Sequence, residues 1–189
     1  MQYGLSDEQE MIVSTVRSFV EKEIYPHEEL VERTGEVPKD IADEIKRKTL
    51  ELGFYGCNFP EAVGGAGLNH MEFALVEREL GRGSMALNHF FGRPQNILMA
   101  CNEEQRERYL MPAMRGELMD ALAMTEPGAG SDVRGMKCTA VHDGGDWVVN
   151  GTKHFISGAE HADFIIVFIA TGEDNTSKGP KKRITTFLV

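Results

Sequence analysis

The sequence has few cysteines, a single tryptophan and no long apolar run. Its three cysteines, Cys57, Cys101 and Cys138, are odd in number and widely spaced, which favours reduced thiols over a disulfide framework or a zinc site. The longest apolar run, Phe164 to Ala170, is much shorter than the ~20 residues that a membrane-spanning helix needs. The acidic N-terminus "MQYGLSDEQE" is not typical of a signal or transit peptide, so we expect a cytoplasmic protein without a membrane partner.

Positive charge is also scarce. The 189 residues include 20 Lys and Arg against 30 Asp and Glu, which gives a formal net charge of −10. Such a surface repels nucleic-acid backbones, and the short basic run Lys181–Arg183 does not reverse this, so we expect no nucleic-acid partner. The six histidines show no metal-ligand spacing, and no metal site is predicted.

The first part of the chain has helical periodicity. Ser6 and Gln9 form a capping box, Pro26 is expected to end the helix that follows, and Asn102 is a good N-cap for a later helix. The expected helical segments are Ser6 to Pro26, Pro38 to Leu52, Met71 to Leu80, Met85 to Ala100 and Glu103 to Met114.

After Gly116 the chain turns into short runs rich in β-branched and aromatic residues. "HDGGDW" (142–147) predicts a hairpin turn, and the polar stretch 172–183 predicts a loop. The expected strands are Ala121–Thr125, Lys137–Val141, Trp147–Asn150, His154–Ser157, Phe164–Ala170 and Ile184–Val189. The predicted fold is α+β: an all-α domain over 1–117, then an antiparallel β-barrel or sandwich domain over 118–189. We expect that second domain to be incomplete, since the chain stops inside an apolar run.

Three motifs occur in a fixed order: "PEAVGGAG" (60–67), "AMTEPGAGSD" (123–132) and "NGTKHFISGA" (150–159). Together they resemble the acyl-CoA dehydrogenase family, and the resemblance covers the whole chain. It implies a helical N-terminal domain that leads into a β domain, with the second motif at the junction. It also implies that this chain is similar to roughly the first half of a member.

The second motif has the composition of a ligand cradle. Gly128 and Gly130 are expected to take positive φ and to let the backbone approach a diphosphate, and Ser131 adds a hydroxyl. The resemblance implies that the ligand is FAD, with Gly130 and Ser131 on its diphosphate and Ser131 also near the substrate thioester. It places Met124 and Thr125 at the pyrimidine edge of the flavin. Taken alone, without the motif, Thr125 and Ser131 are more readily interpreted as turn and cap residues.

The third motif departs from the family pattern at two positions. Phe155 stands in place of the usual Trp that packs on the flavin, and Ser157 stands in place of the usual Thr near flavin N5. Both keep the type of chemistry, although Phe155 loses ring area and an N–H. Without the motif, Phe155 is readable as a core residue. Leu122 replaces a common Tyr, so that contact is not carried over.

The resemblance also places an acyl cavity beside the segment Met85 to Pro94. Asn88, Phe91 and Gly92 are candidate wall residues. Arg93 is unusual there: it could meet a polar or carboxylated acyl chain, or it could be an ordinary surface arginine.

The implied reaction is α,β-dehydrogenation of an acyl-CoA thioester. A carboxylate removes the α proton, the β hydrogen leaves as hydride to flavin N5, and the electrons pass to an electron-transfer flavoprotein. The family's base comes from a C-terminal helical domain that this chain does not contain, so no catalytic residue is assigned and Glu126 is interpreted as structural. We expect the chain alone to be inactive and to bind FAD weakly, and the full protein to be a homo-oligomer. The alternatives are an acyl-CoA oxidase, a desulfinase, or a non-catalytic interaction module.

Overall fold

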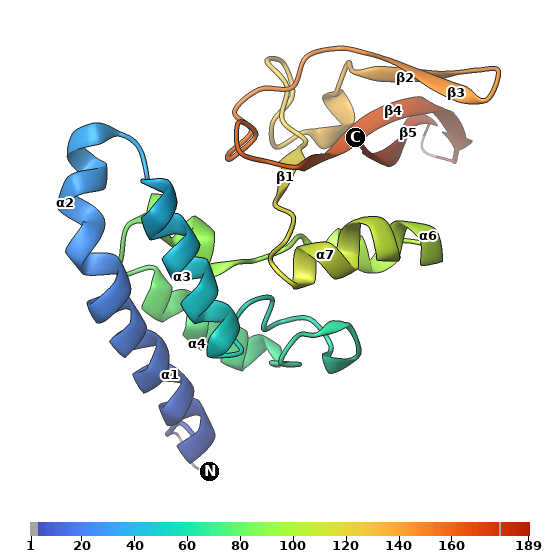
Figure 1. Ribbon diagram of the computed structural model, residues 1–189. Coiled ribbons are helices and arrows are strands. Elements are labelled where there is room, and N and C mark those ends of the chain that lie inside the picture. Colours follow the sequence, from blue (N-terminus) through green and yellow to red (C-terminus); the bar gives the residue numbers. More distant parts are fainter. Residues whose placement is uncertain (1–3, 178) are drawn as a thin grey trace. The chain divides into compact units, whose positions relative to one another are not determined.

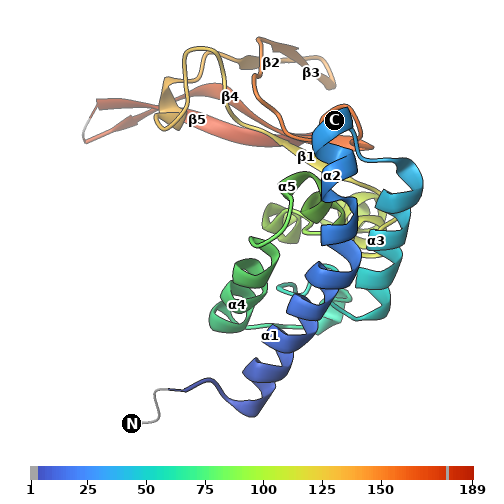
Figure 2. The same cartoon turned by 90° about the vertical axis from the view of Figure 1, so that its left-hand side faces the viewer.

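The computed structural model describes residues 4–177 and 179–189. The chain divides into two compact units, one up to Glu117 and the other from Leu118 on. The first is helical and the second contains a sheet, as Figures 1 and 2 show. The predicted order, helical first and β second, is confirmed.

The chain's first helix begins at the predicted capping box. Helix α1 (Asp7–Phe19) has Ser6 as its N-cap, whose Oγ accepts from the Gln9 amide at 3.2 Å. It continues without a break through a π-helical turn, η1 (Val20–Ile24), into α2 (Tyr25–Thr34). The prediction that Pro26 ends the helix is therefore wrong. Pro26 lies in the first turn of α2, where a missing N–H is tolerated, and the π turn before it accommodates the change in hydrogen bonding.

Two further helices follow the prediction closely. Helix α3 (Lys39–Glu51) begins after Pro38 and ends before Gly53, which has a φ of 74°. Helix α4 (His70–Leu80) begins with a capping box between Asn69 and Glu72. The remaining helical pieces are short: η2 (Glu61–Val63), α5 (Met85–Asn88), η3 (His89–Phe91), η4 (Asn96–Ala100), α6 (Glu103–Gln105), η5 (Arg106–Leu110) and α7 (Met111–Met114).

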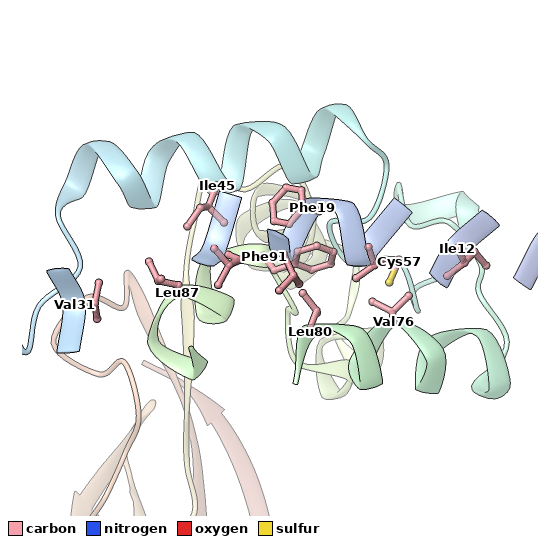
Figure 3. Close-up of a cluster of buried hydrophobic side chains, with 12 residues drawn as sticks. Ile12, Phe19, Val31, Ile45, Cys57, Val76, Leu80, Leu87 and Phe91 are labelled. Carbon is pink, nitrogen blue, oxygen red and sulfur yellow. The ribbon is translucent and has the colours of Figure 1, made fainter. Parts of the chain in front are cut away.

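The core of the helical unit lies between α1, α3, α4 and the segment around Phe91 (Figure 3). Phe91 is 1% exposed and meets the edge of Phe19 with ring centroids 5.3 Å apart. Such edge-to-face aromatic pairs stabilise a core by ~1 kcal/mol beyond the area that they bury. The buried cluster consists of Ile12, Val16, Phe19, Val20, Ile24, Val31, Ile45, Cys57, Val76, Leu80, Leu87 and Phe91.

The second unit is a mixed, open sheet rather than the antiparallel one expected. Its strands are β1 (Asp120–Ala123), β2 (Thr139–Asp143), β3 (Asp146–Asn150), β4 (Phe164–Thr176) and β5 (Gly179–Leu188). The order is β1-β4-β2-β3, and β5 pairs with β4. β1 pairs with β4 in parallel, as β2 does at one position, whereas β2–β3 and β4–β5 are antiparallel. The long connection from β1 to β4 makes this parallel pairing possible, because parallel strands need a crossover.

Two segments of this unit differ from the sequence-based expectation. Residues 154–157 do not form a strand but a loop. Most of the stretch 172–183 is not a loop, because β4 and β5 extend through it as a hairpin. The ion pair between Arg183 Nη2 and Asp174 Oδ1, at 2.6 Å, lies across these two strands, so charged pairs replace the apolar alternation there. The predicted turn in "HDGGDW" is confirmed, with Gly144 at a φ of 61°.

Two features are absent from residues 4–177 and 179–189. No helix in these ranges is long and apolar enough to cross a bilayer. The same ranges contain no cluster of three or more His, Cys, Asp or Glu side chains placed to hold a metal ion. All three cysteines are free, and Cys57 and Cys138 are buried.

Candidate functional site

The chain makes a tight turn two residues after β1. Glu126 and Ala129 exchange two main-chain hydrogen bonds, at 2.9 and 3.1 Å, with Pro127 and Gly128 at the corner. The prediction of positive φ at Gly128 and Gly130 is wrong, since neither glycine has it. A turn with proline at its second position does not require left-handed backbone at the third, which explains the difference.

The backbone of this turn is open to a ligand. A Cβ built on Gly128 or Gly130 would meet no other atom within 4 Å, and both residues are exposed, as is Ser131. Main-chain amides and a hydroxyl that lie free of covering side chains suit a diphosphate. The residues present therefore fit the part of FAD predicted for them, and the individual contacts stay predictions.

Glu126, the first residue of this turn, is buried and only 6% exposed. Its carboxylate accepts from the amides of Lys137 (2.5 Å) and Cys138 (3.0 Å) and from Nζ of Lys153 (2.9 Å). Burial alone would raise the pKa of Glu126, but these hydrogen bonds outweigh it and lower the pKa to about 2. A carboxylate that binds protons so weakly and has its oxygens occupied is a poor general base. Its surroundings are those of a structural residue.

The third motif lies directly against the second. The amide of His154 donates to the main-chain oxygen of Thr125 at 2.9 Å, and Nζ of Lys153 donates to that of Met124 at 3.0 Å. These two bonds bring Met124 and Thr125 next to the segment that carries Phe155. Three of the predicted cofactor residues are thus neighbours in the structure.

Phe155 has an unusual backbone and an unusual exposure. Its φ of 56° is the only positive value of a non-glycine residue among the described residues, and its side chain is 80% exposed. The ring of His154 stacks on it, with centroids 3.6 Å apart. Strained residues persist where the surrounding structure holds them and are concentrated at functional sites. The alternative reading of Phe155 as a core residue does not hold. Ser157 is exposed two residues later.

Two of the four acyl-cavity residues predicted in the helical unit have packing roles in the structure. Asn88 is 4% exposed, and its Nδ2 donates to the main-chain oxygens of Leu80 (2.5 Å) and Gly83 (3.2 Å), which caps the end of α4. Phe91 lies in the centre of the core. Their contribution to an acyl cavity stays a prediction.

The other two predicted residues, Gly92 and Arg93, follow in sequence. Gly92 has a φ of 84° and lies against the ring of Tyr55, where a Cβ would come within 1.9 Å of Cε2. Arg93 forms an ion pair with Glu77, and both side chains are about a third exposed. This pair favours the reading of Arg93 as a surface arginine, and a contact with substrate stays a prediction.

Lys153 is the site residue that sequence reasoning missed. Its side chain is 11% exposed and binds both Glu126 and Met124. A signal was present: a carboxylate within a loop of small residues needs a cationic partner when it is buried, and the third motif holds one lysine.

Solved structures similar to this helical unit and mixed sheet include a flavin-dependent oxidoreductase, a dehydrogenase in complex with FADH2. Two family models match this chain. "Acyl-CoA dehydrogenase, N-terminal domain" matches residues 6–117, and "Acyl-CoA dehydrogenase, middle domain" matches residues 121–189. The chain belongs to the acyl-CoA dehydrogenase family, which uses FAD.

Known proteins similar to this chain include reductases and dehydrogenases. A 3-(aryl)acrylate reductase of Clostridium sporogenes is 38% identical over 97% of this chain and 48% of its own length. The CarC subunit of the caffeyl-CoA reductase-Etf complex of Acetobacterium woodii is 35% identical, again over 97% and 48%. A glutaryl-CoA dehydrogenase from Mycobacterium smegmatis, solved in complex with FADH2, is 28% identical with a TM-score of 0.76 over 98% of this chain and 46% of that one. The chain spans about half the length of the curated relatives it matches.

Proposed function

We propose that the protein catalyses FAD-dependent α,β-dehydrogenation of an acyl-CoA thioester. One observation carries the proposal: the His154 amide binds the Thr125 main-chain oxygen at 2.9 Å and so joins the second and third motifs into one surface. Two motifs far apart in sequence that meet in this way, both predicted to contact the same cofactor, support a single binding site. The identity of the acyl chain, that of the electron acceptor and the oligomeric state are likewise proposed.

Each residue of this surface has a proposed task. Met124 and Thr125 hold the pyrimidine edge of the flavin, Gly130 and Ser131 bind the diphosphate, and Phe155 packs on the ring system. The proposed set is completed by Ser157, which lies near N5, and by the acyl-cavity residues Asn88, Phe91, Gly92 and Arg93. When bound, FAD supplies the acceptor for the β hydride.

The α proton needs a base, and Glu126 does not fit that task. Its pKa of about 2 and its three donors hold it in the ionised, fully bonded form. The other carboxylates of the motifs, Glu61 and Asp132, are exposed. We propose that neither is the base and that these 189 residues alone bring about no turnover.

The partners are proposed from the relatives. One relative is a subunit of a reductase-Etf complex, which supports an electron-transfer flavoprotein as the electron partner. We further propose a cytoplasmic homo-oligomer without nucleic-acid partners, as the net charge of −10 and the reduced thiols favour.

A flavin titration tests the cofactor site. Titration of the purified protein with FAD, followed by flavin absorbance, should show saturable binding. Thr125→Val and Ser131→Ala should each weaken it by about tenfold, since each removes one hydrogen bond to a charged or polar ligand group. Thr186→Val on β5, a threonine outside the motifs, serves as control. Binding that is unchanged in both motif variants would contradict the assignment.

An anaerobic substrate test examines the reaction itself. In a protein that carries these 189 residues together with the domain expected to supply the base, mixing the FAD-loaded form with a panel of saturated acyl-CoAs should bleach the flavin with at least one of them, whereas these 189 residues alone should not. Rapid bleaching followed by reoxidation with oxygen would favour the oxidase alternative, and release of sulfite from a sulfinate substrate would favour the desulfinase. Tight FAD binding without any reaction would favour the interaction module.

A second candidate is the reverse reaction, reduction of an α,β-unsaturated acyl group. Two of the relatives carry reductase names, and both names denote aryl-substituted acrylate-type substrates. The same site residues serve both directions, because hydride transfer at the flavin is reversible. Photoreduced protein mixed with an arylacryloyl-CoA should then reoxidise faster than oxidised protein is bleached by the saturated analogue.

A further inference from the structure

Lys153 connects the two motifs through one buried ammonium group. Its side chain is 11% exposed, and Nζ donates to the main-chain oxygen of Met124 at 3.0 Å and to Oε1 of Glu126 at 2.9 Å. A buried ammonium is costly unless it is paired and hydrogen-bonded, so these two acceptors define its position.

The oxygen that Lys153 binds belongs to the peptide group between Met124 and Thr125. This group is planar and trans, so its C=O and its N–H point in opposite directions. An ammonium on the oxygen therefore fixes the direction of the Thr125 N–H. It also polarises the peptide group, which makes the N–H a stronger donor. Within residues 4–177 and 179–189, the structure shows no acceptor for this N–H, so it is available to a ligand.

The next peptide group is held by the same segment of the third motif. The His154 amide donates to the oxygen of Thr125, and the N–H of that peptide group, from Glu126, binds Ala129. Both peptide groups that flank Thr125 are thus fixed from the segment that also presents Phe155. Glu126 is itself held by two main-chain amides, so its carboxylate forms a fixed counter-charge behind the ammonium.

We propose that Lys153 is a positioning residue that strengthens the Thr125 N–H as a donor to bound FAD and thereby raises the reduction potential of the cofactor. The inference rests on the proposed function, in which Met124 and Thr125 meet the pyrimidine edge of the flavin. Reduction places negative charge on that edge, so a stronger donor there favours the reduced form. Lys153 exchanges no proton and no electron in this role.

The test compares reduction potentials of FAD-loaded variants by equilibration with a reference dye. Lys153→Met should weaken the binding of reduced FAD about tenfold more than the binding of oxidised FAD, which lowers the two-electron potential by about 30 mV. Lys153→Arg keeps the charge and should lower the potential less. The dissociation constant of oxidised FAD, measured alongside, separates this effect from a general loss of the site.

Two further variants keep the test decisive. Lys181→Met is the control, because it removes the charge of an exposed lysine on β5. It should leave the potential unchanged. The double variant Lys153→Met/Glu126→Gln removes both charges together and avoids an unpaired buried carboxylate, and it should still show the lowered potential. An unchanged potential in the folded double variant overturns the inference, whereas unaltered protein that takes up no FAD overturns the proposed function instead.

Discussion

Gly151 lies so close to Cys138 that a Cβ on Gly151 would be 2.2 Å from Sγ and 2.7 Å from Cα of the cysteine. The two residues flank the ion pair of the candidate site. The amide of Cys138 donates to Glu126, and Gly151 precedes Lys153 by two residues. The absence of a side chain at Gly151 therefore lets the third motif approach the second.

Gly151→Ala should destabilise the β unit and loosen this approach. Backbone and side-chain atoms of Cys138 occupy the space, and the φ of 145° at Gly151 disfavours alanine as well. Overpacking of this kind costs about 1–3 kcal/mol, so we expect a loss of about 2 kcal/mol or more in the free energy of unfolding in urea. Gly145→Ala on the nearby hairpin, where a Cβ meets nothing within 4 Å, should change it little. Equal losses for the two variants would contradict the steric argument.

Gly92→Ala should destabilise the helical unit through the ring of Tyr55. A Cβ would come within 1.9 Å of the ring, and φ is 84°. Gly35 separates the two causes, because its φ is 74° and its Cβ would meet nothing within 4 Å. Left-handed backbone alone costs an alanine about 1–2 kcal/mol. Gly35→Ala should show that loss only, and Gly92→Ala a clearly larger one, by thermal or urea unfolding. A Gly92→Ala protein no less stable than Gly35→Ala would show that Tyr55 moves aside without cost.

The buried carboxylate of Glu126, which accepts hydrogen bonds from the amides of Lys137 and Cys138 and from Lys153, should make the protein sensitive to acid. The folded pKa of Glu126, about 2, is lower than the ~4.3 of a glutamate in an unfolded chain. Its contribution to stability is therefore complete above about 4.3 and is lost as the pH falls toward about 2. Unfolding in urea from neutral pH down to about 3 should show this decline.

Glu126→Gln should remove this part of the pH dependence. It should also lower stability at neutral pH by about 3–5 kcal/mol, since it leaves the ammonium of Lys153 buried without a charge partner. Glu160→Gln, at an exposed position of the same unit, is the control. A Glu126→Gln protein that keeps the full acid-dependent decline would place its cause in other carboxylates.

Much of the helical unit could be predicted from the sequence because its signals are local. The capping box at Ser6 and the bounds of α3 depend on neighbouring residues only. The prediction that Pro26 ends the first helix is wrong because proline can either follow the end of a helix or lie in the first turn of one. In addition, the π turn that joins α1 to α2 has no clear sequence signature. The parallel pairing of β1 with β4 joins segments about forty residues apart, which strand periodicity alone does not reveal.

The motifs predict which single residues belong to the candidate site, but not the contacts between them. Met124, Thr125 and Phe155 follow from the motifs, and the structure places them side by side. The positive φ expected in this site occurs at Phe155 and not at Gly128 or Gly130. Composition suggests where backbone can be strained, but the hydrogen bonds of the folded loops decide where it is. The role of Lys153 depended on a contact between residues 27 positions apart, which only the fold supplies.

Arg93→Ala should have little effect on stability. The ion pair with Glu77 is about a third exposed on both sides, and such pairs contribute ~0.2–1 kcal/mol. If Arg93 also meets a polar acyl group, the ratio of kcat/KM for carboxylated acyl-CoAs to kcat/KM for plain acyl-CoAs should fall about tenfold or more in the variant. Glu77→Gln breaks the same ion pair and serves as control. An unchanged substrate preference in Arg93→Ala ends the idea of a substrate contact.

Phe155→Gly should make the protein more stable and bind FAD less tightly. Glycine adopts a φ of 56° without strain, whereas left-handed backbone costs an ordinary residue about 1–2 kcal/mol. Because the side chain is 80% exposed, its removal sacrifices little buried area, so we expect a gain of about 1 kcal/mol in the free energy of unfolding without FAD. The FAD dissociation constant should rise about tenfold, as loss of one aromatic contact predicts. Phe155→Trp keeps the strain and restores ring area, so it should leave stability unchanged and bind FAD at least as tightly as the native protein. Stability and affinity that both fall in Phe155→Gly would mean that the ring supports the loop rather than the cofactor.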